Sequence, residues 1–295
     1  MKNIIAMSLA LGITLAFITM LCWGFGDFLI QKSARKFGDV ETLFLISFFG
    51  AIVLLPFIYG QLNSIFTISN LIILSITSVV MLIGALLDFE ALKKGKLAIV
   101  EPIYALEIPV AGLLAFFIIK ETLTIQQLIL LCSLLFGLVL VSLKSHHFSK
   151  RIWLEKGIFL VLLGAIFMGG SNFLVGLSSR QTNPLMINWF MSLFMTITCL
   201  GIMVYRKKTK SFLKDCKNNK KILFNMCLLD QSAWLAFAFA MTLAPISIAV
   251  ALSESYIIVA MLLGVYINKE FLRKNQKIGL VIAIVSAIAL ASITI

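Results

Sequence analysis

The stretch AIVEPIYALEIPVAGLLAFFIIKETLTIQQLILLCSLLFGLVLVSL, from Ala98 to Leu143, reads as two apolar segments separated by a short charged element. Each segment is about 20 residues long, which is the length that an α-helix needs to span a bilayer. Lys120 and Glu121 lie between them. Glu107 lies thirteen residues before Lys120, so its carboxylate is expected near the middle of the membrane.

The same pattern returns in the second half of the chain. A shift of 149 residues places Lys269-Glu270 on Lys120-Glu121, and 12 of the 24 positions from Ile108 to Leu131 are then identical. Self-similarity of this kind indicates an internal repeat.

A second shift, of 145 residues, superimposes Trp23–Arg35 on Met168–Arg180 and matches a glycine, a phenylalanine, a leucine, a serine and an arginine. The two shifts together predict two related halves, residues 1–145 and 146–295.

Composition identifies the class of protein. Apolar residues make up 61% of the chain and charged residues 13%, whereas soluble domains carry about 25% charged residues. We therefore expect an all-α integral membrane protein, with ten transmembrane helices as two inverted five-helix repeats. The helices are predicted at residues 7–31, 42–60, 68–90, 97–119, 124–143, 157–179, 184–205, 222–243, 246–267 and 276–294.

The basic residues predict how the helices are oriented. Of the 25 lysines and arginines, 22 fall in the links that follow helices 1, 3, 5, 7 and 9, and only Lys2, Lys120 and Arg180 fall on the other side. The positive-inside rule makes those five links cytoplasmic and puts both termini outside. Five helices per half is an odd number, so the halves cross the membrane in opposite senses. A basic excess of this kind also explains the net charge of +12 without a nucleic-acid partner.

The motifs that close the fourth helix of each half are the most specific feature. Both read Lys-Glu-x-Leu-x-x-x-Gln, at residues 120–127 and 269–276, and each half begins with a glycine-containing helix. In these features and in its ten-helix organisation, the chain resembles the EamA-like metabolite exporters of the drug/metabolite transporter superfamily. It departs from their pattern in having Lys, not Gly, before each glutamate.

The resemblance implies a secondary active transporter that exports a small metabolite, amino acid or amine across the cytoplasmic membrane, driven by protons or by the gradient of the solute itself. Such a protein is a multi-pass protein of the inner (cytoplasmic) membrane, a monomer or homodimer, and not an enzyme. Its partners are a small-molecule solute, the lipid bilayer and protons. The cysteines and histidines show no ligand spacing, so no metal and no cofactor are expected.

Four acids inside the predicted spans are candidates for substrate binding or proton coupling. Glu107 and Glu254 nearly coincide under the 149-residue shift, Asp230 lies about eight residues into the eighth helix, and Asp27 lies nearer the cytoplasmic end of the first. A charged group at such depth is costly and marks a functional site by default. The alternatives are a structural hydrogen bond to a neighbouring helix and, for Asp27, an ion pair with Lys32 or Arg35. Asp88, by contrast, is expected in an interfacial ion-pair cluster with nearby lysines.

Aromatic and proline residues stand close to these acids. Tyr104 precedes Glu107 by three residues and Trp234 follows Asp230 by four, spacings that put each pair on one helix face. Their rings could stack on a flat or cationic solute, or serve only in packing. Pro102 and Pro109 predict an interruption in the fourth helix, as transporters have beside their substrates. The alternative for Pro102 is a place in the first turn of the helix, where proline has no special consequence.

One enzyme class remains as an alternative. The string Gly24-Phe25-Gly26-Asp27 has the GxGD pattern of intramembrane aspartyl proteases, in which two aspartates share a proton. That chemistry needs a second aspartate on a neighbouring helix, usually after tyrosine, and the chain contains no Tyr-Asp pair.

Overall fold

The computed structural model describes residues 2–94, 103–142, 156–207, 212, 216, 219–267, 269 and 271–295, and within these residues the chain is helical, with no strand. The elements of the first half are α1 (Lys2–Phe37), α2 (Asp39–Ile58), η1 (Tyr59–Gln61), α3 (Leu62–Ile65), α4 (Ile68–Lys94), α6 (Glu107–Ile119) and α7 (Ile125–Ser142). Those of the second half are α8 (Lys156–Gln181), α9 (Pro184–Tyr205), α11 (Lys220–Leu243), α12 (Ile246–Ser253), α13 (Tyr256–Ile267) and α14 (Lys274–Thr294).

By length and composition, the described residues contain nine spans able to cross a membrane, together with the shorter apolar helix α6. One of the nine combines α12 and α13, so the ten predicted crossings are accounted for. The first helix was predicted to end at residue 31 but continues to Phe37. Its basic residues end the apolar run but not the helix, because lysine and arginine are good helix formers.

The helices pair as two inverted repeats require. The four most extensive contacts join α1 to α11, α4 to α8, α2 to α9 and α7 to α14. In membrane order these are helices 1 and 8, 3 and 6, 2 and 7, and 5 and 10. Exchanging the halves turns the first pair into the second and leaves the other two unchanged, as a pseudo-two-fold axis in the membrane plane demands. The fold class is therefore confirmed.

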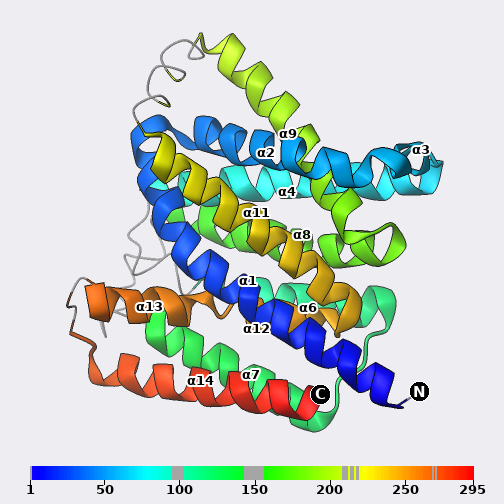
Figure 1. The fold of residues 1–295 in the computed structure, drawn as a ribbon. Coiled ribbons are helices and arrows are strands. Elements are labelled where there is room, and N and C mark those ends of the chain that lie inside the picture. Colours follow the sequence, from blue (N-terminus) through cyan, green and yellow to red (C-terminus); the bar gives the residue numbers. More distant parts are fainter. Residues whose placement is uncertain are drawn as a thin grey trace.

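The ends of the bundle also agree with this topology. In Figure 1 the α1–α2 corner, the end of α13 and the start of α14 lie at the left end, while the α6–α7, α8–α9 and α11–α12 connections and both termini lie toward the right. The termini share one end because an even number of crossings separates them.

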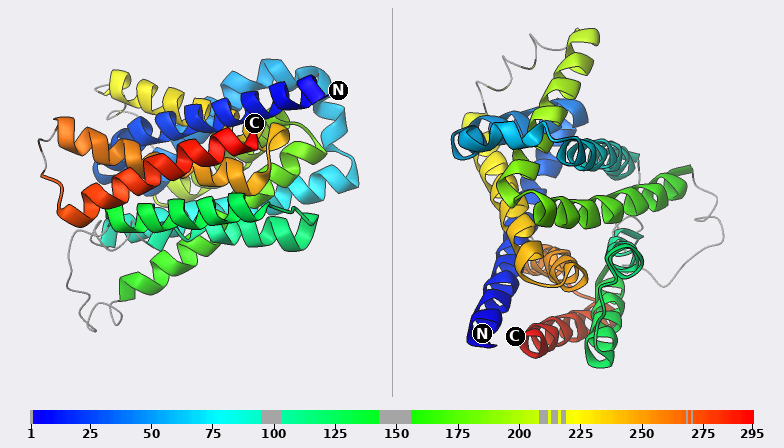
Figure 2. Two further views of the ribbon diagram at one scale, coloured as in Figure 1. Left: turned by 90° about the horizontal axis from the view of Figure 1, so that it is seen from below. Right: turned by 90° about the vertical axis from the view of Figure 1, so that its right-hand side faces the viewer.

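Close glycine packing joins α7 to α14, which lie side by side in Figure 2. A Cβ atom on Gly137 would stand 2.6 Å from the Ala283 nitrogen, and one on Gly279 would stand 2.7 Å from the Val141 nitrogen. Neither distance leaves room for a side chain. Small residues at these points let the two backbones approach, as they commonly do between membrane helices.

The two repeats also end their fourth helices alike. Lys120 and Lys269 have φ angles of 56° and 55°, the left-handed conformation that glycine usually adopts after a helix. The positions where the sequence departs from the family's glycine therefore keep the glycine-like backbone in both halves.

The predicted helices 97–119 and 246–267 are not continuous, and this interruption organises the centre of the molecule. Residues 97–102 lie outside the described residues. In the first half the N–H of Leu106 donates to the carbonyl of Ile103 (3.0 Å), and in the second half that of Ser255 donates to Leu252 (3.3 Å). The two tight turns are separated by 149 residues, so the break is itself repeated.

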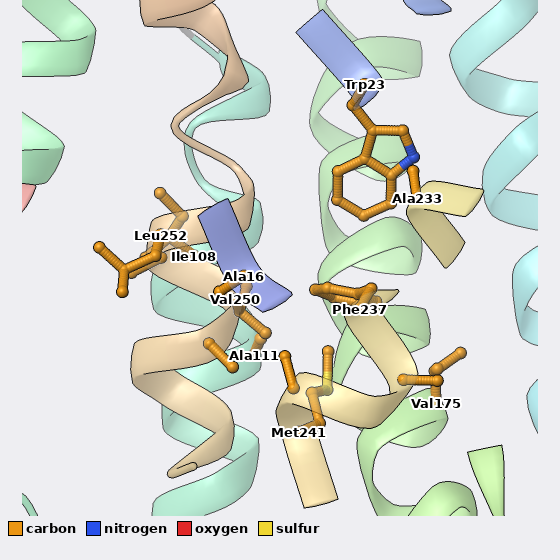
Figure 3. Packing of buried hydrophobic residues seen from close by; sticks show 14 of the residues in the cluster. Ala16, Trp23, Ile108, Ala111, Val175, Ala233, Phe237, Met241, Val250 and Leu252 are labelled. Atoms are coloured by element: carbon orange, nitrogen blue, oxygen red, sulfur yellow. The ribbon is translucent and has the colours of Figure 1, made fainter. Parts of the chain in front are cut away.

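Pro109 lies in the first turn of α6, where no intrahelical donor is required. The prediction that helix 4 is interrupted is thus correct, although α6 begins at Glu107, after the turn. Around the two breaks, residues of α1, α6, α8, α11 and α12 form the main apolar core, as Ala16, Ile108, Val175, Phe237 and Val250 illustrate (Figure 3).

Candidate functional site

Two of the predicted acids meet at the two helix breaks. The side-chain nitrogen of Asn172, in the middle of α8, donates to Glu107 Oε2 at 3.2 Å and to Glu254 Oε1 at 2.9 Å. Glu107 is the first residue of α6, and Glu254 follows the last residue of α12. The three side chains, which we call the carboxylate bridge, are at most 9% exposed. One amide thus connects an acid from each half, at positions that nearly coincide under the 149-residue shift.

Two glycines allow the first helix of each half to reach the broken helix of the other. A Cβ atom on Gly169 of α8 would lie 2.7 Å from the carbonyl oxygen of Glu107, and one on Gly24 of α1 would lie 2.5 Å from Val259 Cβ in α13. These glycines are equivalent under the 145-residue shift. The glycine positions that the sequence comparison matched therefore set the approach of the helices at the site.

Asp27 and Asp88 stand near the carboxylate bridge. Both lie within electrostatic range of Glu107, and Asp88 lies within range of Glu254 as well. The structure thus adds to the candidate site an acid that the sequence had assigned to the membrane interface. The predicted pairing of Asp88 with neighbouring lysines involves side chains outside the described part of the molecule and stays a prediction, as does an ion pair between Asp27 and Lys32 or Arg35.

Tyr104 lies before the first break and is buried against Val161 and Ala165 of α8. Its hydroxyl donates to the backbone carbonyl of Asp88 at 3.2 Å, which ties the start of the broken helix to α4. The structure therefore associates Tyr104 with Asp88 as well as with the helix that carries Glu107.

Asp230 belongs to a second, aromatic group. Its carboxylate accepts a hydrogen bond from Trp234, one turn further along α11, as the four-residue spacing predicts. The ring centroid of Trp23 lies 5.1 Å from that of Trp234, 5.0 Å from that of Phe237 and 6.4 Å from that of Tyr256. Figure 3 shows Trp23 and Phe237 at this contact. Because Tyr256 follows Glu254 by two residues, the aromatic group adjoins the carboxylate bridge.

A third polar group, which we call the inter-repeat clamp, joins the halves at one end of the bundle. The carboxylate of Glu121 accepts hydrogen bonds from the backbone N–H groups of Ile246 (2.8 Å) and Ser247 (2.9 Å) and from the Ser247 hydroxyl (2.7 Å). These are first-turn donors of α12, which have no partners within the helix. A carboxylate at a helix N-terminus is stabilised by the helix dipole.

Arg180, at the end of α8, completes the clamp. It donates to the carbonyl oxygens of Met241 (2.7 Å) and Ala244 (2.8 Å), at the end of α11, and lies 3.8 Å from Glu121. The carbonyls at a helix C-terminus carry partial negative charge, so a cation is favourable there. The clamp therefore neutralises two helix ends at once.

Sequence reasoning missed Asn172 and the clamp, although signals for both were present. Asn172 falls on Asp27 under the 145-residue shift, so the repeat marks it as the counterpart of a candidate acid. Glu121 belongs to the Lys-Glu element that both halves share, but its contacts lie 125 and 126 residues away along the chain. Only the fold reveals what the element binds.

Comparisons with known proteins agree with this architecture. The chain is 28% identical to the uncharacterized protein MJ1333.1 of Methanocaldococcus jannaschii over 134 residues, which are 45% of this chain and 97% of that protein. The match therefore corresponds in length to one of the two halves. A protein of known crystal structure shares the fold, with a TM-score of 0.76, 13% identity and 96% of each chain covered.

The sequence profile of the EamA-like transporter family matches the chain twice, over residues 10–143 and 155–292. The two matches cover most of the chain and follow its two halves. They support a multi-pass membrane transporter that acts on a small-molecule solute, and they lend no support to an aspartyl protease built on Asp27. With its paired helix breaks and two five-helix repeats, this chain belongs to the EamA-like transporter family.

Proposed function

We propose that the protein is a secondary active transporter that exports a small amine, amino acid or related metabolite across the cytoplasmic membrane, with the carboxylate bridge as its solute and proton site. The observation that carries the proposal is the meeting of one buried acid from each half at two repeat-related helix breaks. Interrupted helices at equivalent positions of inverted repeats commonly form the substrate site of secondary transporters.

The charge of the site favours a cation. Glu107 and Glu254 are buried, Asp27 and Asp88 add to the negative field, and all 25 basic residues of the chain fall in links or at helix edges. Buried carboxylates need protons or a positive partner, because an uncompensated charge in a medium of low polarity is costly. A protonated amine and protons can each meet this need. If they compete for the same carboxylates, binding of one expels the other, which yields exchange.

Movement of the two halves would expose the site alternately to the two sides. The site lies between the halves, and the inter-repeat clamp closes one end of their interface. By the distribution of basic residues this end is the outer one, with both termini on the same side. One chain contains both repeats, so a monomer suffices for a complete pathway. Export is the direction that the family resemblance implies.

The aromatic group is proposed as the wall of the solute path. Trp234 is held by Asp230 and packs against Trp23, whose helix also carries Asp27. Aromatic faces attract ammonium groups. Tyr104 is proposed to position the first break through its bond to Asp88.

The test is transport by the purified protein in proteoliposomes that contain a trapped pH dye, with panels of amines, amino acids, sugars and nucleosides added outside. We expect a solute-evoked proton movement that is lost in Glu107→Gln and in Glu254→Gln. The control variant is Asp39→Asn, which removes an acid at the start of α2, away from the site. It should transport like the unchanged protein.

Two results would contradict the proposal. If solute crosses equally in both glutamine variants and no proton moves, the carboxylates are structural and the protein is a facilitator. If no solute crosses under any gradient, although the reconstituted protein is folded, the site does not serve transport. Folding is checked independently by the elution profile and thermal unfolding of each variant.

A further inference from the structure

The atoms of Asn172 point to a more specific ligand for the carboxylate bridge. An asparagine amide has two N–H donors and one carbonyl oxygen that can accept two hydrogen bonds. The nitrogen donates to one oxygen of Glu107 and one of Glu254. The amide oxygen Oδ1 is buried and has no hydrogen-bond partner among the described residues, and Asn172 is 0% exposed. A buried carbonyl without a donor is uncommon and destabilising.

Within the described part of the chain, the oxygens of the carboxylate bridge that the amide leaves unbonded are therefore acceptors when both carboxylates are ionised. Each carboxylate keeps one oxygen that the amide does not bond, and Oδ1 adds a third kind of acceptor beside them. Asn172 uses its amide hydrogens to hold the two carboxylates together, so it cannot also donate to a solute. A ligand that satisfies this site must bring both positive charge and N–H groups.

We propose that the carboxylate bridge binds a primary ammonium group, with one ammonium N–H donating to Oδ1 of Asn172 and the others to Glu107 and Glu254. A primary ammonium carries three N–H donors in addition to its charge. A quaternary ammonium carries the charge alone and would leave Oδ1 unpaired. Sites built to hydrogen-bond a donor reject analogues without it, because their own buried polar groups then stay unsatisfied.

This inference rests on the proposed function but can fail separately from it. The experiment uses the full-length protein in nanodiscs and measures the concentration of ligand that gives half-maximal thermal protection. The probes are butylammonium, its N-methyl and N,N-dimethyl forms, and butyltrimethylammonium, at constant ionic strength. We expect affinity to fall with each methyl group, by about tenfold or more in total, because each methyl replaces one N–H.

Variants at position 172 separate hydrogen bonding from size. In Asn172→Leu, which has a similar volume and no polar atom, the preference for the primary ammonium should fall to about threefold or less. Asn172→Asp keeps acceptor oxygens and should retain the preference. Ser171→Ala is the matched control, because its hydroxyl bonds the Phe167 carbonyl of its own helix. It should bind like the unchanged protein.

Several outcomes would overturn the assignment. Equal affinity for butylammonium and butyltrimethylammonium would show that the site recognises the positive charge and not the N–H groups, even if transport persists. A preference for the primary ammonium that survives unchanged in Asn172→Leu would show that Oδ1 of Asn172 does not recognise the ligand. Protection by Na⁺ with no protection by any ammonium probe would identify a metal-cation site formed by the same oxygens. Failure of every solute to cross in the proteoliposome assay would instead remove the proposed function itself.

Discussion

Replacing Glu121 by glutamine is expected to open the start of α12. In the clamp, Glu121 Oε2 accepts the N–H of Ile246, and Oε1 accepts the N–H and hydroxyl of Ser247. A glutamine of the same length keeps one acceptor oxygen and places an NH₂ group where the other stood. If the oxygen stays with Ser247, the N–H of Ile246 faces another donor and loses its partner.

The size of the effect follows from these contacts. An unpaired buried donor costs about 2 kcal/mol, and loss of a negative charge at a helix N-terminus costs about 1 kcal/mol. The sum of about 3 kcal/mol corresponds to a factor of about 100 in the equilibrium between closed and open clamp. Local opening of this kind sets the rate at which backbone amides exchange with solvent.

Hydrogen exchange of the protein in nanodiscs, followed by mass spectrometry, measures the equilibrium between the closed and the open clamp. The peptide that contains residues 246–249 should exchange about 100-fold faster in Glu121→Gln. The matched control is Lys120→Gln, which changes the charge of the adjacent, exposed residue and leaves the clamp intact. Unchanged exchange in Glu121→Gln, or equal acceleration in both variants, would refute this account of the clamp.

Three further predictions concern the backbone at the site and the helix end. Gly169→Ala should abolish transport and lower the unfolding temperature, because its methyl group would meet a backbone oxygen. Gly201→Ala should do neither, because its methyl group would meet no atom of the described residues within 4 Å. Gly24→Ala should reduce transport in uptake assays, because its methyl group would clash with the side chain of Val259. The second change Val259→Ala should restore most of the transport, because it removes both Cγ atoms of the clashing side chain. Lys120→Gly should stabilise the protein by about 1 kcal/mol in denaturant unfolding, because the left-handed conformation strains any residue with a Cβ atom.

The sequence predicted the architecture well because length, apolarity and basic residues determine it locally. It also predicted the break in helix 4, since Pro102 and Pro109 each withhold a backbone donor and loosen the preceding turn. The break in helix 9 has no interior proline to mark it and follows only from the repeat. The spacing of Asp230 and Trp234 predicted their contact because four residues make one helical turn.

The contacts between the halves could not be read from the sequence. Asn172 is neutral, and a search for buried charge passes over an amide that connects two charges. Glu121 stood in the most specific motif of the chain, yet its ligands are backbone N–H groups, which no residue type reveals. Local patterns thus identify the helices and the acids, whereas the partners of those acids depend on how the halves meet.

The clamp has a consequence for biosynthesis. Glu121 leaves the ribosome 125 residues before Ile246, whose N–H it binds. At about 5–20 residues per second, this separation corresponds to roughly 6–25 seconds of translation. During that interval the acceptor is already made, whereas its backbone donors in α12 are not yet synthesised. Arrival of α12 at Glu121 is therefore among the late steps of assembly, and a chain that stalls before α12 would leave the carboxylate of Glu121 without these donors.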